Sequence, residues 1–339
     1  MDFELSDDQV ALRDAARGLL DDLAAPARVR AHLVSGEPYD RHLWAAMADQ
    51  GWLGIDVPDD AGGLGLGFVE AAVLMEEVGR HVAPGPFHQT LLAVGATRGT
   101  AWADALLGGG GVGCVAWSEG AARTLVPYAP VADVAVVASA DGIVVHDLRN
   151  GERPVAEPAM DQTRCVGWLP RDRPGAQEVG GPADAAALLD RGAVATAAES
   201  LGAAGRVLEM SVEHAKERVQ FGKPIGSFQA VKHRCADMLV DLEGMRSTVY
   251  HGAWSIAAGD PDASVAASTA KVWCADAARR IMASGLQVHG GVGFTWEHDL
   301  HLFLKRAQLD QVSFGAAPFH RERLAGLLRG KLERGETIV

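Results

Sequence analysis

Two segments of the chain carry residues that suit the binding of a ligand with phosphate groups. The first segment contains Arg218, Gln220, Phe221 and Gln229, and the second contains Gln287, Gly290 and Gly291. A guanidinium such as that of Arg218 presents a rigid fork of donors to phosphate oxygens. At Gly290 and Gly291 the missing Cβ lets the backbone approach a bound group closely. Taken singly, the first segment is also typical of a helix end with a C-cap glycine, and the second of a turn.

The order and spacing of these segments resemble the C-terminal domain of the acyl-CoA dehydrogenase family. The similarity rests on residues 217–222 (ERVQFG), 228–230 (FQA), 287–294 (QVHGGVGF) and 310–315 (DQVSFG). Residues 51–58 (GWLGIDVP) and 62–67 (GGLGLG) are similar to the N-terminal helical domain of the same family. The resemblance covers nearly the whole chain and is strongest over residues 190–315.

The resemblance places no carboxylate where the family has its catalytic base. In the family the last of these segments usually reads Tyr-Glu-Gly-Thr, and its Glu removes the α-proton of the substrate. The matching residues here are 313–316 (SFGA), so Phe314 stands in place of the Glu. A phenyl ring cannot accept a proton. Family members without this Glu can carry the base one helix earlier, and that position falls on Gly192.

Three carboxylates lie near these positions in the sequence. Asp310 and Glu199 are the nearest substitutes for the base, but both are better interpreted as solvated charges on helix faces. Asp190 matches a position that contacts the acyl-CoA in some relatives. In a chain without a base, that match would be vestigial.

The resemblance implies FAD as the cofactor. It places Arg218 on the pyrophosphate, Phe221 beside it and Gln229 close to the adenosine half, while Gln287 and the pair 290–291 make the second set of contacts. In the family these residues reach a FAD whose flavin lies mainly in the neighbouring subunit. A chain that keeps them without a base resembles the short non-catalytic subunit of heteromeric α2β2 acyl-CoA dehydrogenases of the steroid side-chain-degrading type.

We therefore expect a heterotetramer in which a catalytic acyl-CoA dehydrogenase subunit carries the Glu and the flavin pocket and binds most of the acyl-CoA. An electron-transfer flavoprotein is the expected electron acceptor. Two alternatives remain open: a homo-oligomeric flavoprotein with an atypical base, and a flavin-free scaffold or binding protein of the same fold. A neighbouring longer reading frame with Tyr-Glu-Gly-Thr would favour the heteromer.

The chain divides into three predicted domains, a helical domain at 1–111, a shortened β-domain at 112–181 and a helical bundle at 182–339. Ser6 can cap a first helix, whose apolar residues recur at three- and four-residue spacing. The glycine run 108–111 is predicted to be a linker. The predicted fold is mainly α with a small central β-domain, as in the acyl-CoA dehydrogenases.

Short β-branched segments predict strands at 114–117, 134–137 and 142–145. The family keeps its flavin in a β-barrel domain at this place, but the match is thin. The family motif Thr-Glu-Pro-x-x-Gly-Ser-Asp is reduced here to residues 118–121 (SEGA), so a reduced barrel is expected. Four long helices, roughly at 183–217, 227–258, 262–290 and 296–330, predict the C-terminal four-helix bundle.

Composition argues against nucleic-acid and membrane partners. The 339 residues carry a formal net charge of -13, whereas nucleic-acid binding depends on basic patches. No run approaches the ~18 apolar residues of a membrane span. The acidic start, residues 1–8 (MDFELSDD), lacks the apolar core of a signal or transit peptide, so we expect a cytoplasmic protein. The four cysteines are far apart and are predicted to be free thiols.

The remaining candidate features are interpreted as structural. His298 and His301 have a spacing that can share a helix face, and His289 lies upstream, but no third ligand stands where it could close a metal site. No Ser-His-Asp arrangement with a nucleophile-elbow motif is present in the sequence. Core or interface packing is predicted for the aromatic residues Tyr250, Trp254 and Trp273.

Overall fold

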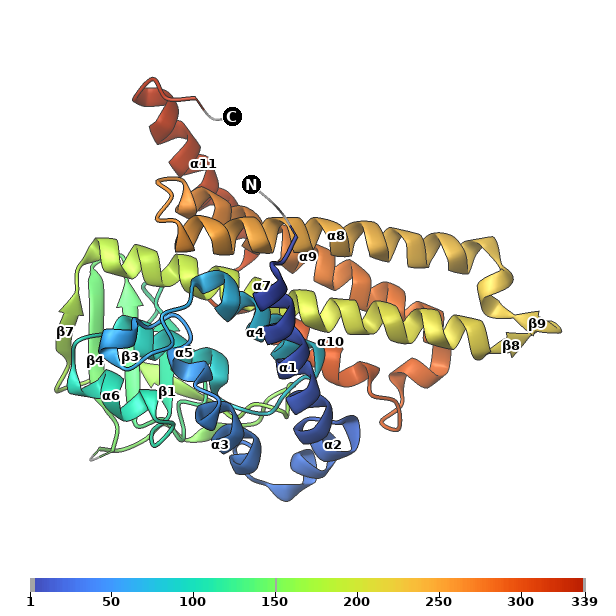
Figure 1. Cartoon of the computed structure of the whole chain (residues 1–339), viewed down its shortest axis with the longest axis horizontal. Coiled ribbons are helices and arrows are strands. Elements are labelled where there is room, and N and C mark those ends of the chain that lie inside the picture. The colour runs from blue at the N-terminus through green and yellow to red at the C-terminus, as the bar shows by residue number, and fades with distance from the viewer. Residues whose placement is uncertain (1–3, 150, 338–339) are drawn as a thin grey trace.

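The computed structural model describes residues 4–149 and 151–337, and it is mainly helical with most of its strands in the middle of the chain (Figure 1). The N-terminal helices are α1 (Asp7–Leu23), α2 (Pro26–Ser35), α3 (Arg41–Asp49), α4 (Phe68–Arg80), α5 (Phe87–Ala96) and α6 (Ala101–Leu107). The C-terminal helices are α7 (Pro182–Glu217), α8 (Gln229–Ala257), α9 (Ala263–His289), α10 (Leu300–Val312) and α11 (Ala317–Glu333). The predicted fold class is confirmed. Among the described residues, no helix is both long and apolar enough to cross a membrane.

The first helix begins at the predicted cap. The backbone N–H of Gln9 donates to Ser6 Oγ at 3.2 Å, and the backbone N–H of Ser6 donates to Gln9 Oε1 at 3.0 Å. This reciprocal capping box satisfies two of the donors that a helix start leaves free. Residues 1–3, at the predicted acidic start, lie outside the described part of the chain.

The central β-region consists of two small sheets. The four-stranded sheet has the order β1-β3-β4-β7, with β1 (Gly113–Trp117), β3 (Val134–Ser139), β4 (Gly142–Asp147) and β7 (Gln177–Gly180). The three-stranded sheet has the order β2-β6-β5, with β2 (Arg123–Pro127), β6 (Val166–Pro170) and β5 (Ala156–Glu157). The predicted strands correspond to β1, β3 and β4. Strands β5 and β7 were not predicted, because none of their residues is buried and neither strand contains an apolar run.

The C-terminal part contains three long helices, α7 to α9, close to their predicted ranges. The predicted fourth helix at 296–330 is wrong, because residues 313–316 separate α10 from α11. Phe314 has φ 52° and Gly315 has φ 88°, and a left-handed backbone cannot continue a right-handed helix. The domain limits at 111 and 181 stay predictions; they fall between α6 and β1 and at the start of α7.

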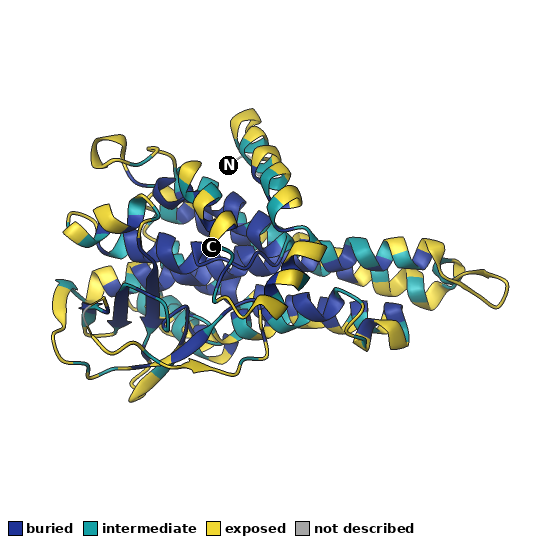
Figure 2. Ribbon diagram, turned by 90° about the horizontal axis from the view of Figure 1, so that it is seen from below, coloured by how far each residue is buried: buried dark blue, intermediate teal, exposed yellow. Residues whose placement is uncertain are grey.

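The ends of α7 and α8 project from the body as an arm that is tipped by the hairpin of β8 (Val219–Gln220) and β9 (Lys223–Pro224) (Figure 1). Figure 2 shows that the arm is largely exposed or half-buried, whereas the centre of the bundle is buried. Residues 216–224 are all exposed. The tip of the arm is therefore available for a contact outside this chain.

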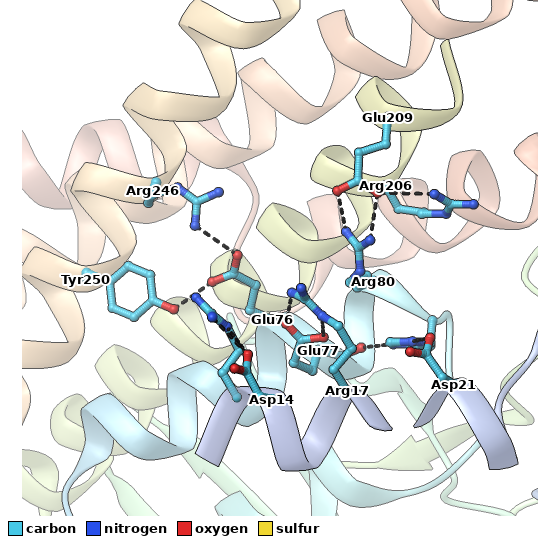
Figure 3. A network of polar contacts seen from close by, with 12 residues as sticks. Asp14, Arg17, Asp21, Glu76, Glu77, Arg80, Arg206, Glu209, Arg246 and Tyr250 are labelled. Atoms are coloured by element: carbon cyan, nitrogen blue, oxygen red, sulfur yellow. Dashed lines mark hydrogen bonds and ion pairs between the residues drawn. The ribbon is translucent and has the colours of Figure 1, made fainter. Parts of the chain in front are cut away.

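Ion pairs fasten the N-terminal helices to the bundle (Figure 3). Glu77 on α4 is fully buried and accepts two hydrogen bonds from Arg17 of α1, at 3.0 and 2.6 Å. The preceding residue, Glu76, accepts from the Tyr250 hydroxyl at 2.6 Å and from Arg246 at 3.1 Å, both on α8. Because a buried carboxylate is costly without donors, these bonds fix α1, α4 and α8 relative to one another.

Helices α4 and α7 cross at glycines. A Cβ added to Gly79 would lie 1.9 Å from the carbonyl oxygen of Glu199, and one added to Gly202 would lie 1.7 Å from that of Glu76. Only glycine permits this approach of the two backbones. The close crossing sets the position of Glu199 in the centre of the protein.

Candidate functional site

Phe314 and Gly192, the two predicted base positions, meet in the folded chain. A Cβ added to Gly192 would lie 2.2 Å from Cδ1 of Phe314, far inside van der Waals contact. The ring of Phe314 also stacks on the imidazole of His88, with centroids 5.8 Å apart and planes at 22°. Phe314 is 6% exposed. Its side chain fills the space where the resemblance would place a base from either position.

Helix α11 holds the backbone of Phe314 in its left-handed conformation. His320 Nε2 donates to the carbonyl oxygen of Phe314 at 2.8 Å, and His320 Nδ1 lies 3.3 Å from the hydroxyl of Ser268. A carbonyl oxygen can only accept, so Nε2 carries the proton while Nδ1 accepts from the hydroxyl. Burial lowers the pKa of His320 to about 4. The imidazole is therefore a neutral, fixed support for Phe314.

A cavity of about 300 Å³ lies beside Phe314, between the β-region and residues 312–315. Its lining includes Trp168 of β6, and the guanidinium of Arg123 lies 4.4 Å from the centroid of that ring. Among the described lining residues, Glu119 is the one carboxylate, on the exposed turn after β1. The amide oxygen of Gln89, another lining residue, already accepts the backbone N–H of Val115 at 2.8 Å.

Buried charges form a cluster that joins the β-region to the bundle and was not predicted from the sequence. Its three cations and three carboxylates, each at most 3% exposed, are Arg164, Lys271, Arg306, Asp161, Glu199 and Asp310. Arg306 donates to Asp161 at 2.7 Å and to Glu199 at 2.5 Å. Arg164 pairs with Glu199 and, at 3.3 Å, with Asp310. The Lys271 ammonium donates to the backbone carbonyl of Asp310 at 2.5 Å.

The cluster corrects the prediction for Glu199 and Asp310, which are fully buried rather than solvated charges on helix faces. Although burial opposes its ionisation, Arg164 and Arg306 hold the pKa of Glu199 well below its usual value. Burial, together with Glu199, raises the pKa of Asp310 to about 8. Neither carboxylate is among the residues that line the cavity, so neither is placed to act as the base.

Two further residues near Phe314 have structural partners. His88 Nδ1 lies 3.1 Å from Glu199 Oε2, so the buried cluster reaches the ring that stacks on Phe314. Asp190 accepts from Ser264 at 2.6 Å and from Arg323 at 2.5 Å, which ties α7 to α9 and α11. No motif in the sequence marks His88, because its role depends on α5 lying against α7.

The predicted cofactor residues lie on the arm and at the end of α9. The rings of His214 and His289 stack with centroids 4.6 Å apart, which brings the end of α7, before Arg218, beside the end of α9, before Gly290. The exposed side chains of Arg218, Gln229 and Gln287 make no hydrogen bond or ion pair within the described residues. The amide of Gln220 donates to the carbonyl of Val219, its neighbour on β8, at 2.9 Å.

Backbone geometry at the arm is unusual at two predicted contact residues. Gly290 has φ 62° and ψ −142°, a conformation that is essentially restricted to glycine. A Cβ added to Gly290 or Gly291 would meet no protein atom within 4 Å, so the space beside them is open. Phe221 has φ 53° and is 91% exposed at the tip of the hairpin. The arm thus presents free donors and an exposed aromatic ring, and the end of α9 adds open glycines.

The histidines and aromatic residues that the sequence analysis interpreted as structural lie in several places in the fold. His289 lies 4.6 Å from the rings of both His214 and His298, whereas His301 packs on Trp296 at 4.9 Å. Over residues 4–149 and 151–337, no group of three or more His, Cys, Asp or Glu could hold a metal ion. The Tyr250 hydroxyl bonds to a carboxylate of α4, as described above. Trp254 and Trp273 are 39% and 41% exposed, which leaves interface packing as their predicted role.

Known proteins are similar to this chain in sequence and in fold. The N-terminal and C-terminal domain families of acyl-CoA dehydrogenases match residues 6–101 and 180–328. The acyl-CoA dehydrogenase IpdE2 of Mycobacterium tuberculosis is 37% identical over 304 residues, covering 87% of this chain and 89% of IpdE2. A chain of the ChsE4-ChsE5 complex from Mycobacterium tuberculosis matches with a TM-score of 0.86 and 26% identity, over 97% of this chain and 99% of that chain. A chain of a variant of the Tcur3481-Tcur3483 steroid ACAD also has a TM-score of 0.86, with 29% identity over 96% of this chain and 99% of that chain. This chain belongs to the acyl-CoA dehydrogenase family.

Proposed function

We propose that this chain is the non-catalytic subunit of a heteromeric, FAD-dependent acyl-CoA dehydrogenase, and that it supplies half of a cofactor site to a catalytic partner. One distance carries the proposal. Gly192, beside Phe314, lies in the first third of α7, and Arg218 is its C-cap. A rise of 1.5 Å per residue separates the two residues by roughly 39 Å. A dinucleotide is shorter than this separation. We therefore assign Arg218 to a cofactor whose flavin ring lies in another chain.

The contacts of Phe314 support the assignment of proton abstraction to the partner. The reaction removes the α-proton of a CoA thioester with a carboxylate, and FAD, when bound, supplies the acceptor for the hydride that leaves the β-carbon. The ring of Phe314 occupies the space over Gly192. Glu199 and Asp310 are bound to arginines in the buried cluster. We assign the base to a Glu of the catalytic subunit.

The residues of the arm and of the end of α9 fit the pyrophosphate and adenosine parts of FAD. The free guanidinium of Arg218 offers two parallel donors to phosphate oxygens, and Gln229 and Gln287 offer amides without competing partners. Gly290 and Gly291 leave their backbone open to a ligand. In this assignment, Phe221 packs beside the cofactor and Gln220 belongs to the same contact set. This chain's residues bind and orient the cofactor and take no part in proton transfer.

The names of the relatives suggest the partner and the substrate class. One similar structure is a ChsE4-ChsE5 complex and another is called a steroid ACAD. We infer an α2β2 assembly with a catalytic acyl-CoA dehydrogenase subunit, which binds most of a CoA thioester with a steroid-derived side chain. An electron-transfer flavoprotein would receive the electrons.

The test compares the chain purified alone with the chain co-expressed with a longer acyl-CoA dehydrogenase that carries Tyr-Glu-Gly-Thr, to be sought in a neighbouring reading frame. Flavin per chain, subunit ratio and turnover with an artificial electron acceptor are measured for both. We expect little FAD and no turnover from the single chain, and flavin with equal numbers of both subunits in the complex. Stoichiometric flavin with turnover in the single chain would contradict the proposal and favour a homo-oligomer with an atypical base. In that case Glu119→Gln tests the one carboxylate of the cavity lining.

A further inference from the structure

Arg30, on α2, binds the connection between α9 and α10 with all three nitrogens of its guanidinium. Nε donates to Asp299 Oδ1 at 2.6 Å, and the two terminal nitrogens donate to the carbonyl oxygens of Trp296 at 2.6 Å and Glu297 at 2.8 Å. The Arg30 side chain is 33% exposed. A residue of the N-terminal helices therefore holds one side of residues 290–299, which we call the 290–299 segment.

Contacts among three imidazoles also hold the segment. His298 packs against His289 with centroids 4.6 Å apart and planes at 63°, and His289 stacks on His214 of α7 at 4.6 Å and 24°. His289 Nδ1 also bonds to the carbonyl of Gly285 at 2.8 Å, which fixes its ring. Since His298 lies between Glu297 and Asp299, the contacts of Arg30 set the position of this ring.

Trp296 is also held by bundle residues, because its ring lies 4.9 Å from that of His301 and 4.0 Å from Lys305 Nζ. Residues 290–294 are mostly exposed, although Gly293 is buried. The space beside the α-carbons of Gly290 and Gly291 is open, and Val292 and Phe294 are 43% and 72% exposed. A segment with little buried apolar surface keeps its conformation through its anchors. Loss of the Arg30 contacts would therefore free the backbone around Gly290.

We propose that Arg30 is a positioning residue for the cofactor half-site. It acts through Asp299 and His298 to hold the 290–299 segment, so that Gly290 faces the same ligand as Arg218. The proposal rests on the function proposed above, because it concerns the same half-site. Arg30 itself does not touch the cofactor.

The test measures the rate of FAD release, by flavin fluorescence after dilution, from the complex of this chain with its catalytic subunit. Arg30→Gln should release FAD roughly five- to thirtyfold faster, the range expected for one or two net hydrogen bonds. Arg30→Lys, which keeps the charge without the fork, should fall between Arg30→Gln and the parent. Hydrogen exchange of the amides in 290–302 should accelerate in Arg30→Gln even in the single chain.

Two control variants separate positioning from a general loss of stability. Arg28→Gln removes a charge from the same helix, where Arg28 lies 3.3 Å from His42 and not beside the segment. Arg17→Met breaks the bond to buried Glu77 and lowers stability at a distant place. Both controls should keep parental FAD release and parental exchange in 290–302. Faster FAD release from Arg17→Met, in proportion to its lost thermal stability, would overturn the positioning role.

The remaining outcomes distinguish this inference from the proposed function. Parental FAD release in Arg30→Gln, together with fast release in Arg218→Ala, would overturn the role of Arg30 and leave the shared cofactor site standing. Parental release in Arg218→Ala would overturn the shared site and the inference with it. If Arg30→Gln does not fold, Asp299→Asn serves as the test, because it removes the ion pair alone. This variant should also release FAD faster than the parent, by a smaller factor than Arg30→Gln. Release at the parental rate from Asp299→Asn would overturn the inference.

Discussion

The phenyl ring of Phe314 lies directly over the α-carbon of Gly192, where a Cβ would come within 2.2 Å of Cδ1. The two positions that could carry a base in this family therefore depend on each other. A large apolar side chain at 314 needs glycine at 192. A packed, apolar contact between these two residues occupies the expected place of the base.

We expect Gly192→Ala to lower the free energy of unfolding by about 1–3 kcal/mol, because the added methyl group overpacks the contact with Phe314. Urea denaturation measures the change. Gly205→Ala, on the same helix, is the control; its added methyl group would lie 3.9 Å from the nearest atom, on Leu242, so it should be neutral or slightly stabilising. The double variant Gly192→Ala with Phe314→Ala should lose less than the sum of the single variants. Unchanged stability of Gly192→Ala would contradict the observed contact.

Phe314→Glu should create no dehydrogenase activity above the parental level in the complex. If the FAD that this chain's arm contacts belongs to the partner's active site, no flavin faces a carboxylate at position 314. Steady-state turnover with an acyl-CoA and an artificial electron acceptor gives the result. Strong new turnover would mean that the cavity beside Phe314 still holds a flavin and that the base alone had been lost.

Arg218→Ala should weaken FAD binding to the complex by about 1.5–3 kcal/mol, roughly ten- to a hundredfold, because a charge-assisted contact to phosphate is lost. Arg218→Lys should recover part of the loss, since an ammonium does not reproduce the guanidinium fork. Flavin remaining after gel filtration is the measurement. Lys216→Ala, which removes an exposed cation two residues earlier, is the control. Equal flavin in all four proteins would remove the main support for a shared site.

Arg306→Met should lower the free energy of unfolding by about 3–5 kcal/mol, because it leaves Asp161 and Glu199 buried with too few donors. Adding Glu199→Gln should restore part of the stability by removing one of the two carboxylate charges that lost a donor. Thermal and urea unfolding of the single and double variants test this. If the double variant is less stable than Arg306→Met, the two side chains do not interact as their distance implies.

Stability should fall as the pH is lowered from about 6.5 to 4. Burial lowers the pKa of His320 to about 4, from a usual value of 6.5, so the unfolded chain takes up a proton in this range before the folded chain does. The corresponding loss is up to about 3 kcal/mol at the acid end. His320→Gln keeps a donor for the carbonyl of Phe314 and cannot titrate. Urea denaturation at pH 7 and 4.5 should show a smaller pH effect in this variant, and an identical pH effect would exclude His320 as its source.

Local features of the sequence were enough to predict many elements. Ser6 caps α1 as expected, and the ranges of α7, α8 and α9 follow from apolar periodicity that each helix carries by itself. The break at 313–316 was missed because Phe314 adopts a left-handed backbone that phenylalanine does not favour locally. Its conformation is held by His320, from the following helix.

The buried charges of the candidate site also could not be predicted from local features of the sequence. Arg306 and Asp310 lie one turn apart on α10, so the sequence indicates that they share a helix face. It does not indicate whether that face meets water or the core. Only the packing of α10 against α7 and the loop before β6 buries them with Arg164 and Glu199.

The sequence by itself determined which chemistry is available, because a residue type fixes its functional group: Phe314 and Gly192 offer no proton acceptor, and Arg218 offers a phosphate-binding fork. The tertiary structure decided how these groups are arranged. The turn after α10 brings Phe314 onto Gly192, while the straight length of α7 keeps Arg218 roughly 39 Å away. The separation from Arg218 follows from the helical rise within α7, whose range the sequence also predicts. The contact of Phe314 with Gly192 depends on the packing of residues far apart in the chain, and the sequence alone does not determine it.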